Sequence, residues 1–303
     1  MSKLKDAFLN ILSKNSIDPS TKKVLLIGKN DDTKTVKLAL KDIDFACKYY
    51  IEDIDIIDSF LDADIIINTD KNLNDIDLTK FKNNILNFDY ISLQYRSNLG
   101  IQSKYLHIPY YSKYYVEYLS NCLENGKDLD NIGYIEELVK RVNITLIGMP
   151  ASGKTTIGKN LAEKYKKLSY DTDAEIKDIV KISIPEYFAQ FGEQSFRDVE
   201  EKVIKNLSTK SGIIISVGGG AVLRETNMYS LQKNSIIVLV LRRVDNLSTF
   251  GRPLSKDLDT LKEMEKIRMP LYTKYADISA VNDGSKIDLL NKVLRSLYED
   301  INY

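Results

Sequence analysis

Short apolar runs alternate with amphipathic segments along the whole chain. In the first part the apolar runs are residues 23–27, 63–68 and 89–93, and the segments with helical spacing are residues 35–41 and 112–124. In the second part the apolar runs are residues 142–147, 167–170, 212–217, 235–241 and 276–280. Such runs are typical of strands buried on both faces of a parallel sheet. The alternation predicts an α/β fold with parallel sheets flanked by helices.

Glycine is spread unevenly and separates two parts of the chain. Residues 1–141 hold four of the 14 glycines, and residues 142–303 hold the other ten. The change follows a polar stretch at 124–131 and a segment with helical spacing at 134–141. A chain of 303 residues is also long for a single domain. We predict two α/β domains, residues 1–141 and 142–303.

Composition removes several classes of function. The 43 basic residues balance the 43 acidic ones, which argues against a general binder of nucleic acid or membrane surfaces. The longest apolar run, residues 236–241, is far shorter than a membrane span of about 18 residues. Two cysteines and one histidine exclude a disulfide framework, a cysteine-rich zinc site and a metal site with several histidines within this sequence. We expect a soluble, cytoplasmic protein.

Residues 148–155, GMPASGKT, match the phosphate-loop pattern G-x-x-x-x-G-K-[ST] without a mismatch. The match follows a predicted strand and precedes a helical pattern, as this loop requires. Gly153 lets the backbone approach a phosphate, Lys154 supplies charge at the β- and γ-phosphates, and the Thr155 hydroxyl is suited to Mg²⁺. The alternative is a glycine turn with an exposed lysine. The loop predicts nucleotide binding and leaves open a kinase, a GTPase switch or a motor.

Two carboxylates follow the predicted strand at 167–170. Asp171 and Asp173 are two residues apart, so in an extended segment both side chains would face the same way, toward the carboxyl end of the sheet. Asp171 would then hold Mg²⁺ through water, and Asp173 would accept the proton of a substrate hydroxyl. The alternative is a turn with an N-cap for a helix that begins near Ala174.

Glycines and arginines supply the remaining candidate residues. Gly218, Gly219 and Gly220 follow a predicted strand, where bare backbone can contact a ligand or form a mobile turn. Arg197 lies in a helical pattern, where its alternative role is an ion pair with Glu200 or Glu201. Arg252 and Arg268 each precede a Pro-Leu pair, and either is also compatible with ordinary surface chemistry.

Taken in order, these segments resemble one family, the shikimate kinases. The matching segments are GMPASGKTTIGK at 148–159, DTD at 171–173, GEQSFRDVEEKVI at 192–204, SVGGGAV at 216–222, GRPL at 251–254 and IRMPLY at 267–272. The resemblance covers nearly all of residues 142–303. It implies a five-stranded parallel sheet like that of nucleoside monophosphate kinases. It also implies transfer of the γ-phosphate of ATP, taken with Mg²⁺, to the 3-hydroxyl of shikimate, a step toward aromatic amino acids.

The resemblance also implies a role for each candidate residue. The substrates would lie as follows: ATP on Ala151, Ser152, Gly153, Lys154, Thr155, Thr156 and Arg252, and shikimate on Asp173, Arg197, Gly218, Gly219, Gly220 and Arg268. Asp173 would orient and deprotonate the hydroxyl, and Arg197 and Arg268 would hold the carboxylate. Arg252 would close over ATP as the lid arginine. The lid itself is shorter than usual, and residues 247–250 stand where another arginine is expected to pack on adenine.

The first domain resembles a degenerate copy of the cofactor domain of shikimate dehydrogenase. The likeness lies in residues 22–28, 63–69 and 111–126. Gly28 is followed by Lys-Asn-Asp-Asp instead of the glycines that contact a pyrophosphate, and Tyr-Ile-Glu at 50–52 stands where an arginine would bind a 2′-phosphate. The residues before Lys22 are too few for the dehydrogenase substrate domain. We expect no hydride transfer here, and instead a structural, homodimerising or regulatory module.

Tyrosines concentrate near the end of this domain. The segment at 105–118 is tyrosine-rich and would form either a contact surface or a half-buried core, with His107 a packed residue. On the helix expected at 112–124, one apolar face holds Tyr115, Leu119, Cys122 and Leu123. Three readings besides a shikimate kinase stay open: another small-molecule kinase of this fold, a nucleotide-gated binding protein, and a bifunctional protein that retains dinucleotide binding.

Overall fold

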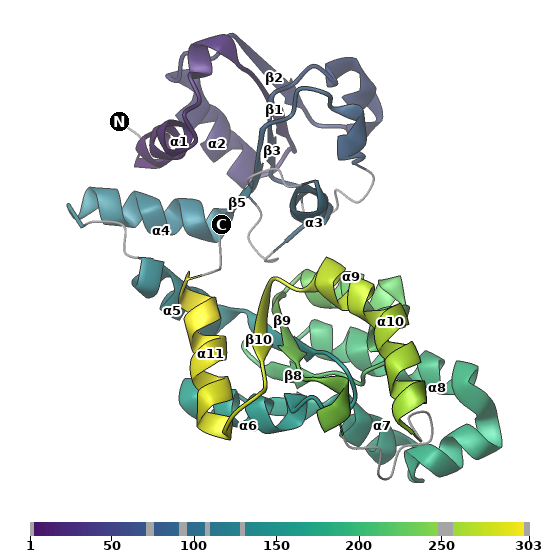
Figure 1. Cartoon of the computed structure of the whole chain (residues 1–303). Coiled ribbons are helices and arrows are strands. Elements are labelled where there is room, and N and C mark those ends of the chain that lie inside the picture. Colours follow the sequence, from purple (N-terminus) through teal and green to yellow (C-terminus); the bar gives the residue numbers. More distant parts are fainter. Residues whose placement is uncertain are drawn as a thin grey trace. The chain divides into compact units, whose positions relative to one another are not determined.

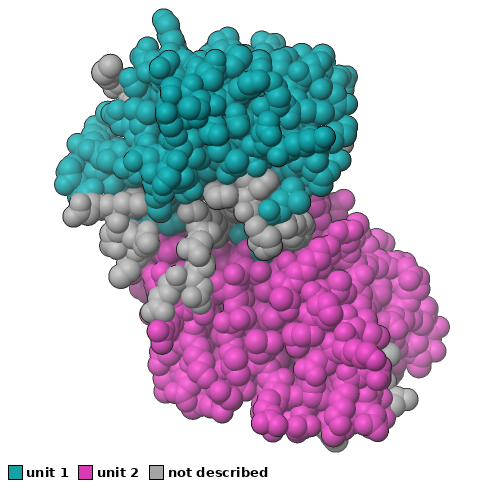
Figure 2. Space-filling view, turned by 45° about the horizontal axis from the view of Figure 1, so that its top comes forward, with its two compact units in different colours: residues 1–134, 303 teal, residues 135–302 magenta. Residues whose placement is uncertain are grey.

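The structure is a computed structural model, and it describes residues 3–70, 76–90, 96–106, 110–127, 131–247 and 257–299. The chain divides into two compact units, residues 1–134 and 135–302, which Figure 2 draws in different colours. Each unit contains a five-stranded sheet in which all paired strands are parallel. The prediction of two helix-flanked parallel sheets is therefore confirmed.

The first unit is built on a sheet with the strand order β2-β1-β3-β4-β5. Its strands are β1 (Lys23–Ile27), β2 (Cys47–Ile51), β3 (Ile65–Asn68), β4 (Leu86–Asp89) and β5 (Tyr110–Ser112). Its helices are α1 (Lys3–Lys14), α2 (Asp31–Lys41), α3 (Asn98–Tyr105) and α4 (Lys113–Glu124). Figure 1 shows α1, α2 and α4 on one face of the sheet and α3 on the other. This unit thus has the layers of an open, doubly wound sheet.

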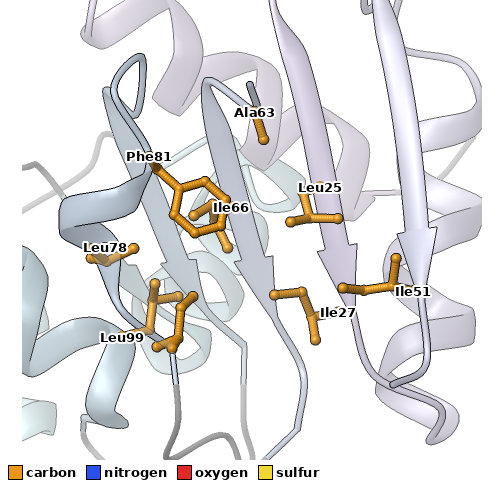
Figure 3. Close-up of a cluster of buried hydrophobic side chains, with 9 residues drawn as sticks. Leu25, Ile27, Ile51, Ala63, Ile66, Leu78, Phe81 and Leu99 are labelled. Carbon is orange, nitrogen blue, oxygen red and sulfur yellow. The ribbon is translucent and has the colours of Figure 1, made fainter. Parts of the chain in front are cut away.

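A cluster of aliphatic and aromatic side chains holds the α3 face of this sheet (Figure 3). The strands contribute Leu25, Ile27, Ile51 and Ile66, and the covering segments contribute Leu78, Phe81 and Leu99, all at most 5% exposed. Burial of this apolar area supplies the main stabilisation of the layer. The continuous apolar runs in the sequence are the cause, since both faces of each central strand are covered.

Three details of this unit differ from the sequence predictions. The strand expected at 89–93 is β4, which ends at Asp89; residues 91–93 lie outside the described residues. β2 and β5 were not predicted, because an edge strand needs only one covered side and both are rich in tyrosine. On α4, Leu123 is 41% exposed, and Val116 is buried in its place.

The second unit has the strand order β10-β9-β6-β8-β7. Its strands are β6 (Asn143–Ile147), β7 (Ser169–Asp171), β8 (Ile214–Ser216), β9 (Ser235–Leu241) and β10 (Ile278–Val281). Its helices are α6 (Lys154–Tyr165), α7 (Thr172–Val180), α8 (Ile184–Ser208), α9 (Glu225–Gln232), α10 (Leu258–Tyr275) and α11 (Lys286–Glu299), and α5 (Asn131–Arg141) leads into β6. Each of the five strands predicted in this part is present.

The strand order fixes where a ligand can bind. β6 comes first in the sequence of this unit yet lies at the centre of the sheet, between β8 and β9. The chain therefore leaves β6 at a point where neighbouring connections run to opposite sides, which is where open α/β sheets bind ligands. In Figure 1, α6 and α11 cover one face of the sheet, and α9 and α10 cover the other. Among the described helices, none combines the length and apolar character needed to cross a bilayer.

Candidate active site

The phosphate loop connects β6 to α6. Gly153 is the N-cap of α6 and has φ +107°, and a Cβ placed on it would lie 2.5 Å from Nδ2 of Asn282. Glycine is therefore required at this position for both its backbone conformation and its contact. Asn282 follows β10 and donates from Nδ2 to the Ser152 carbonyl oxygen at 2.7 Å, which ties the loop to the neighbouring strand. The loop thus presents the N-terminus of α6 to an anion.

Lys154 lies over this loop with its side chain nearly buried. Its exposed fraction is 8%, and its Nζ donates to the carbonyl oxygens of Gly148 at 2.9 Å and Met149 at 2.8 Å. Ser152 is fully buried, and its Oγ finds no hydrogen-bond partner in the described part of the chain. These bonds hold the ammonium group against the loop, which is where a phosphate-binding lysine is needed.

Thr155 and Asp171 form an oxygen pair beside the loop. The Thr155 hydroxyl donates to Oδ2 of Asp171 at 2.6 Å. Oδ1 of Asp171 accepts from the backbone N–H groups of Asp173 at 3.1 Å and Ala174 at 3.3 Å, so the N-cap suggested as the alternative role is real and coexists with this pair. One hydroxyl and one carboxylate fit Mg²⁺, which takes few protein ligands beside phosphates and waters. No group of three or more metal-binding side chains exists among the residues described.

The extended segment that we expected to carry both aspartates is absent. α7 begins at Thr172, two residues earlier than expected, so Asp173 lies in the first helical turn and not in an extended segment. Asp173 and Asp171 nevertheless line the same cavity. The Thr172 hydroxyl accepts from the Gly218 N–H at 2.9 Å, which fixes the start of α7 against the glycine segment.

Arg197 projects from α8 against the glycines. It is 8% exposed, and a Cβ placed on Gly220 would lie 2.3 Å from its Nη2. Its Nη1 donates to Glu200 at 2.8 Å and its Nη2 donates to Glu193 at 3.0 Å. The ion pair with Glu200 that we weighed as an alternative is present, whereas Glu201 pairs with Arg224. The pairing does not remove Arg197 from the cavity, because the guanidinium has five donors in a fork.

Glu200 is a site residue that sequence reasoning missed. Its side chain is fully buried, and burial raises the pKa of its carboxyl while the Arg197 charge opposes that rise. Oε1 finds no hydrogen-bond partner among the described residues. A Cβ placed on Gly218 would lie 2.8 Å from this atom and 2.9 Å from Oδ1 of Asp173, so the two carboxylates lie close together. The spacing of three residues from Arg197 was the available signal.

Arg268 reaches the glycine segment from α10. It is 6% exposed, and its Nη1 donates to the Gly219 carbonyl oxygen at 3.0 Å. The Tyr272 hydroxyl, one turn later on α10, donates to the same oxygen at 2.5 Å. Burial raises the pKa of that hydroxyl to about 12, so it stays a donor at neutral pH. The pair holds Gly219 and aims the arginine at the cavity.

These side chains line a single cavity of about 520 Å³. The predicted residues that line it are Ala151, Gly153, Lys154, Thr155, Thr156, Asp171, Asp173, Arg197, Gly218, Gly219, Gly220 and Arg268. Ser152 lies beneath the loop and does not line it, and Arg252 lies outside the described residues. Lining residues that were not predicted are Pro150, Ile184, Phe188, Phe196, Glu200, Val217, Arg242 and Met264. Most of these come from helices whose approach to the loop only the tertiary structure reveals.

Sequence comparison matches part of the chain to the shikimate kinases. A family model for shikimate kinase matches residues 150–298. A shikimate kinase from Thermodesulfovibrio yellowstonii is 39% identical over 151 residues, which are 47% of this chain and 86% of that protein. A shikimate kinase from Thiobacillus denitrificans is 35% identical over 163 residues, 51% of this chain and 89% of that protein.

Solved structures give a consistent result. The structure of shikimate kinase from Acinetobacter baumannii in complex with shikimate matches with a TM-score of 0.50 and 31% identity, over 53% of this chain and 95% of that chain. A chorismate mutase/shikimate 5-dehydrogenase fusion protein from Clostridium acetobutylicum is a distant neighbour, with 17% identity and a TM-score of 0.34.

The central strand, the phosphate loop and the facing acidic and arginine side chains define the second unit as a phosphate-loop kinase that acts on a small molecule. Within that class the sequence comparisons are specific. The chain belongs to the shikimate kinase family, as its motifs implied.

Proposed function

We propose that this chain transfers the γ-phosphate of ATP to the 3-hydroxyl of shikimate, which gives shikimate 3-phosphate and ADP in the cytoplasm. One observation carries the proposal. Lys154 of the phosphate loop, the Asp173 carboxylate and the guanidinium groups of Arg197 and Arg268 line the same cavity. A nucleotide site and a site for a small anionic alcohol therefore share one space. We place this kinase domain in residues 142–303.

The acceptor end of the cavity fits a carboxylate and a ring. Arg197 and Arg268 lie against Gly220 and Gly219, and arginine matches a planar carboxylate with two parallel donors. The glycine segment leaves backbone exposed to a flat ring because it has no side chains. Phe188 and Phe196 line the same cavity and would cover the apolar edge of such a ring.

Asp173 is the base of this reaction. Its carboxylate lies between the glycine segment and the phosphate loop, where it would orient the 3-hydroxyl and accept its proton during transfer. The buried Glu200 carboxyl lies beside it; burial raises the pKa of Glu200, which also holds Arg197. The reaction then depends mostly on positioning, because phosphoryl transfer has a loose transition state.

The phosphate loop would supply positive charge to neutralise the phosphates of ATP. Lys154 would bind the β- and γ-phosphates in exchange for the loop carbonyls. The Mg²⁺ that accompanies ATP would be held by the Thr155 hydroxyl and, through water, by Asp171, and it would supply further positive charge to the phosphates. Arg252 would add a cation from the lid.

The direct test is ADP release measured with and without shikimate. We expect release that depends on shikimate and is lost by orders of magnitude in Lys154→Met. Asp173→Asn should bind ATP with unchanged affinity and fail to release ADP. Quinate, gluconate and a nucleoside monophosphate serve as competing acceptors. ADP release that is the same without shikimate, or faster with another acceptor, would refute the proposal.

For residues 1–141 we propose a degenerate dinucleotide-binding-like domain that performs no hydride transfer. The N-terminus of α2, where a pyrophosphate would bind, is filled by the chain's own groups. Asn30 accepts from the Thr33 N–H at 2.9 Å and donates to the Thr69 carbonyl oxygen at 2.6 Å. Asp31 and Asp32 add two carboxylates in the first turn. Like charges would repel a phosphate at this position.

The tyrosines of this domain pack on one another. The ring centroids of Tyr111 and Tyr115 are 5.1 Å apart, and Tyr134 lies 5.1 Å from Tyr115 and 5.7 Å from Tyr114. Tyr111 and Tyr115 are at most 4% exposed, which favours the core alternative over a tyrosine contact surface. A homodimer formed through residues 1–141 stays a prediction, and light scattering on the full chain tests it.

A further inference from the structure

Arg242 follows β9 directly and lines the same cavity as the phosphate loop. β9 pairs with the central strand β6 up to Ile147 and Leu239. A Cβ placed on Gly148 would lie 2.5 Å from the Val240 carbonyl oxygen, so the end of β9 is packed against the first residue of the loop. Arg242 comes two residues after this contact. None of the roles derived above uses it.

One guanidinium nitrogen of Arg242 lacks a partner in the part of the chain that the structure describes. This nitrogen, Nε, is buried and makes no hydrogen bond there. The other cations of the cavity are engaged: Lys154 with loop carbonyls, Arg197 with two glutamates and Arg268 with the Gly219 carbonyl. A buried guanidinium nitrogen without a hydrogen bond is costly. An anion that enters the cavity would accept a hydrogen bond from this nitrogen. Charge-assisted bonds to an anion are the strongest hydrogen bonds that a guanidinium can make.

The sheet order indicates which anion this is. β9 lies on one side of β6, whereas β8 and β7, which lead to Gly218 and Asp173, lie on the other side. The acceptor groups of those segments are thus separated from Arg242 by the phosphate loop. Arg242 is therefore placed on the nucleotide side of the loop.

We propose that Arg242 binds the phosphate chain of ATP, as a second cation beside Lys154. Arginine presents a planar fork of donors to phosphate oxygens, so it fixes the direction of the chain as well as its charge. The inference rests on the proposed kinase function for the identity of the reaction, and on the cavity alone for phosphate binding.

The test compares Arg242→Ala and Arg242→Lys with Arg243→Ala in the full chain. Arg243 is the matched control, because it is the neighbouring arginine and its side chain is 79% exposed. Its Nη2 lies 3.6 Å from Oδ2 of Asp245. We expect Arg242→Ala to lower kcat/KM for ATP by about 10- to 100-fold, the loss of a hydrogen bond to a charged group. KM for shikimate should change little. Arg242→Lys should recover part of the loss, and added guanidinium ion should partly rescue Arg242→Ala.

Calorimetric titration with AMP, ADP and a non-hydrolysable ATP analogue gives a second readout that needs no acceptor. The loss in affinity should grow with the number of phosphates, and Arg243→Ala should match the unmodified chain. Unchanged ATP kinetics and affinities in Arg242→Ala would overturn the inference, as would a loss confined to shikimate. If the unmodified chain released no shikimate-dependent ADP, the proposed function would fail, and the titrations would still decide the role of Arg242.

Discussion

Arg268 and Arg197 bring two guanidinium groups to the cavity. Each guanidinium is nearly buried, yet each is held by groups that leave part of its donor fork unused. Arg268 donates from one nitrogen to the Gly219 carbonyl oxygen, and the Tyr272 hydroxyl donates to the same oxygen. Such preorganisation lowers the entropic cost of binding a small carboxylate.

Replacement of Arg268 by alanine should therefore affect the acceptor selectively. We expect Arg268→Ala to raise KM for shikimate by about 10- to 100-fold, because a charge-assisted pair is lost. KM for ATP should stay within about threefold, since Lys154 and the loop are untouched. Lys266→Ala, an exposed lysine on the same helix, is the control. Equal losses for both substrates in steady-state kinetics would place Arg268 elsewhere than at the acceptor.

Asp89 in the first unit predicts a pH dependence of stability. It is 1% exposed, accepts from the Ser97 N–H and from Asn68 Nδ2 at 3.1 Å, and burial raises its pKa to about 6. In the unfolded chain an aspartate titrates near 3.9. The folded state thus binds more protons between these values, and its contribution to stability is present at low pH and lost as pH rises through about 6.

The measurement is urea unfolding of the chain and of Asp89→Asn between pH 4 and pH 7.5, followed by circular dichroism. The difference in unfolding free energy between the two proteins should fall by on the order of 2 kcal/mol as pH rises from about 4 to about 6, and then stay level. Subtracting the variant removes the other carboxylates, which titrate in both proteins. A difference that is independent of pH would show that Asp89 is not perturbed.

At the scale of elements, the loop after β8 decides where Arg197 lies. Gly220 has φ −98°, which alanine also adopts, so its replacement need not strain the backbone. Its Cβ would nevertheless overlap the Arg197 guanidinium, with 2.3 Å to Nη2. We expect Gly220→Ala to fold with an unchanged melting temperature, to raise KM for shikimate at least tenfold and to leave ATP affinity unchanged.

Gly284→Ala is the control for this replacement, because the three atoms nearest to its new Cβ all belong to the side chain of the exposed Asp288. Thermal melts and steady-state kinetics of both variants decide the matter. A Gly220→Ala enzyme with normal shikimate kinetics would mean that Arg197 moves freely or does not touch the acceptor.

Elements with a strong periodic signal were predictable, and their contacts were not. The strands of the second unit are continuous apolar runs, so all five were found from the sequence. β2 escaped because a partly exposed edge strand tolerates polar and tyrosine side chains, and β5 escaped because three residues are too few to show a pattern. The phosphate loop was predictable from spacing, since its pattern is local. The helical spacing offered Glu200 only as an ion-pair partner of Arg197, because its place beside Gly218 depends on the packing of α8. Arg242 was missed because its place in the cavity depends on where β9 ends.

At the scale of the whole molecule, the two α/β units differ in the segment that joins the first strand of the sheet to the next helix. In the second unit, β6 leads into a glycine loop and a lysine. In the first unit, β1 leads to Gly28 and then to Asn30, whose side chain fills the start of α2. Asp32, in the first turn, pairs with Lys113 at 2.6 Å. The same architecture thus leaves the start of the helix after the first sheet strand without a side-chain cap in one unit and caps it in the other.

Titration of the full chain with NADP⁺ tests that contrast. We expect no saturable binding in the micromolar range, because carboxylates and an internal cap stand where a pyrophosphate would bind. ATP, titrated into the same sample, is the positive control for an intact protein. Saturable micromolar binding of NADP⁺ would show that the first unit retains a dinucleotide site and would reopen a bifunctional enzyme.

The central claim is that one cavity brings a triphosphate and a ring alcohol together. Phosphorus NMR of the full chain incubated with ATP, Mg²⁺ and shikimate tests it most directly, because it separates transfer from hydrolysis. We predict equal amounts of ADP and a single new phosphomonoester on the 3-oxygen of shikimate, both absent with Lys154→Met. ADP accompanied by inorganic phosphate alone would contradict the account.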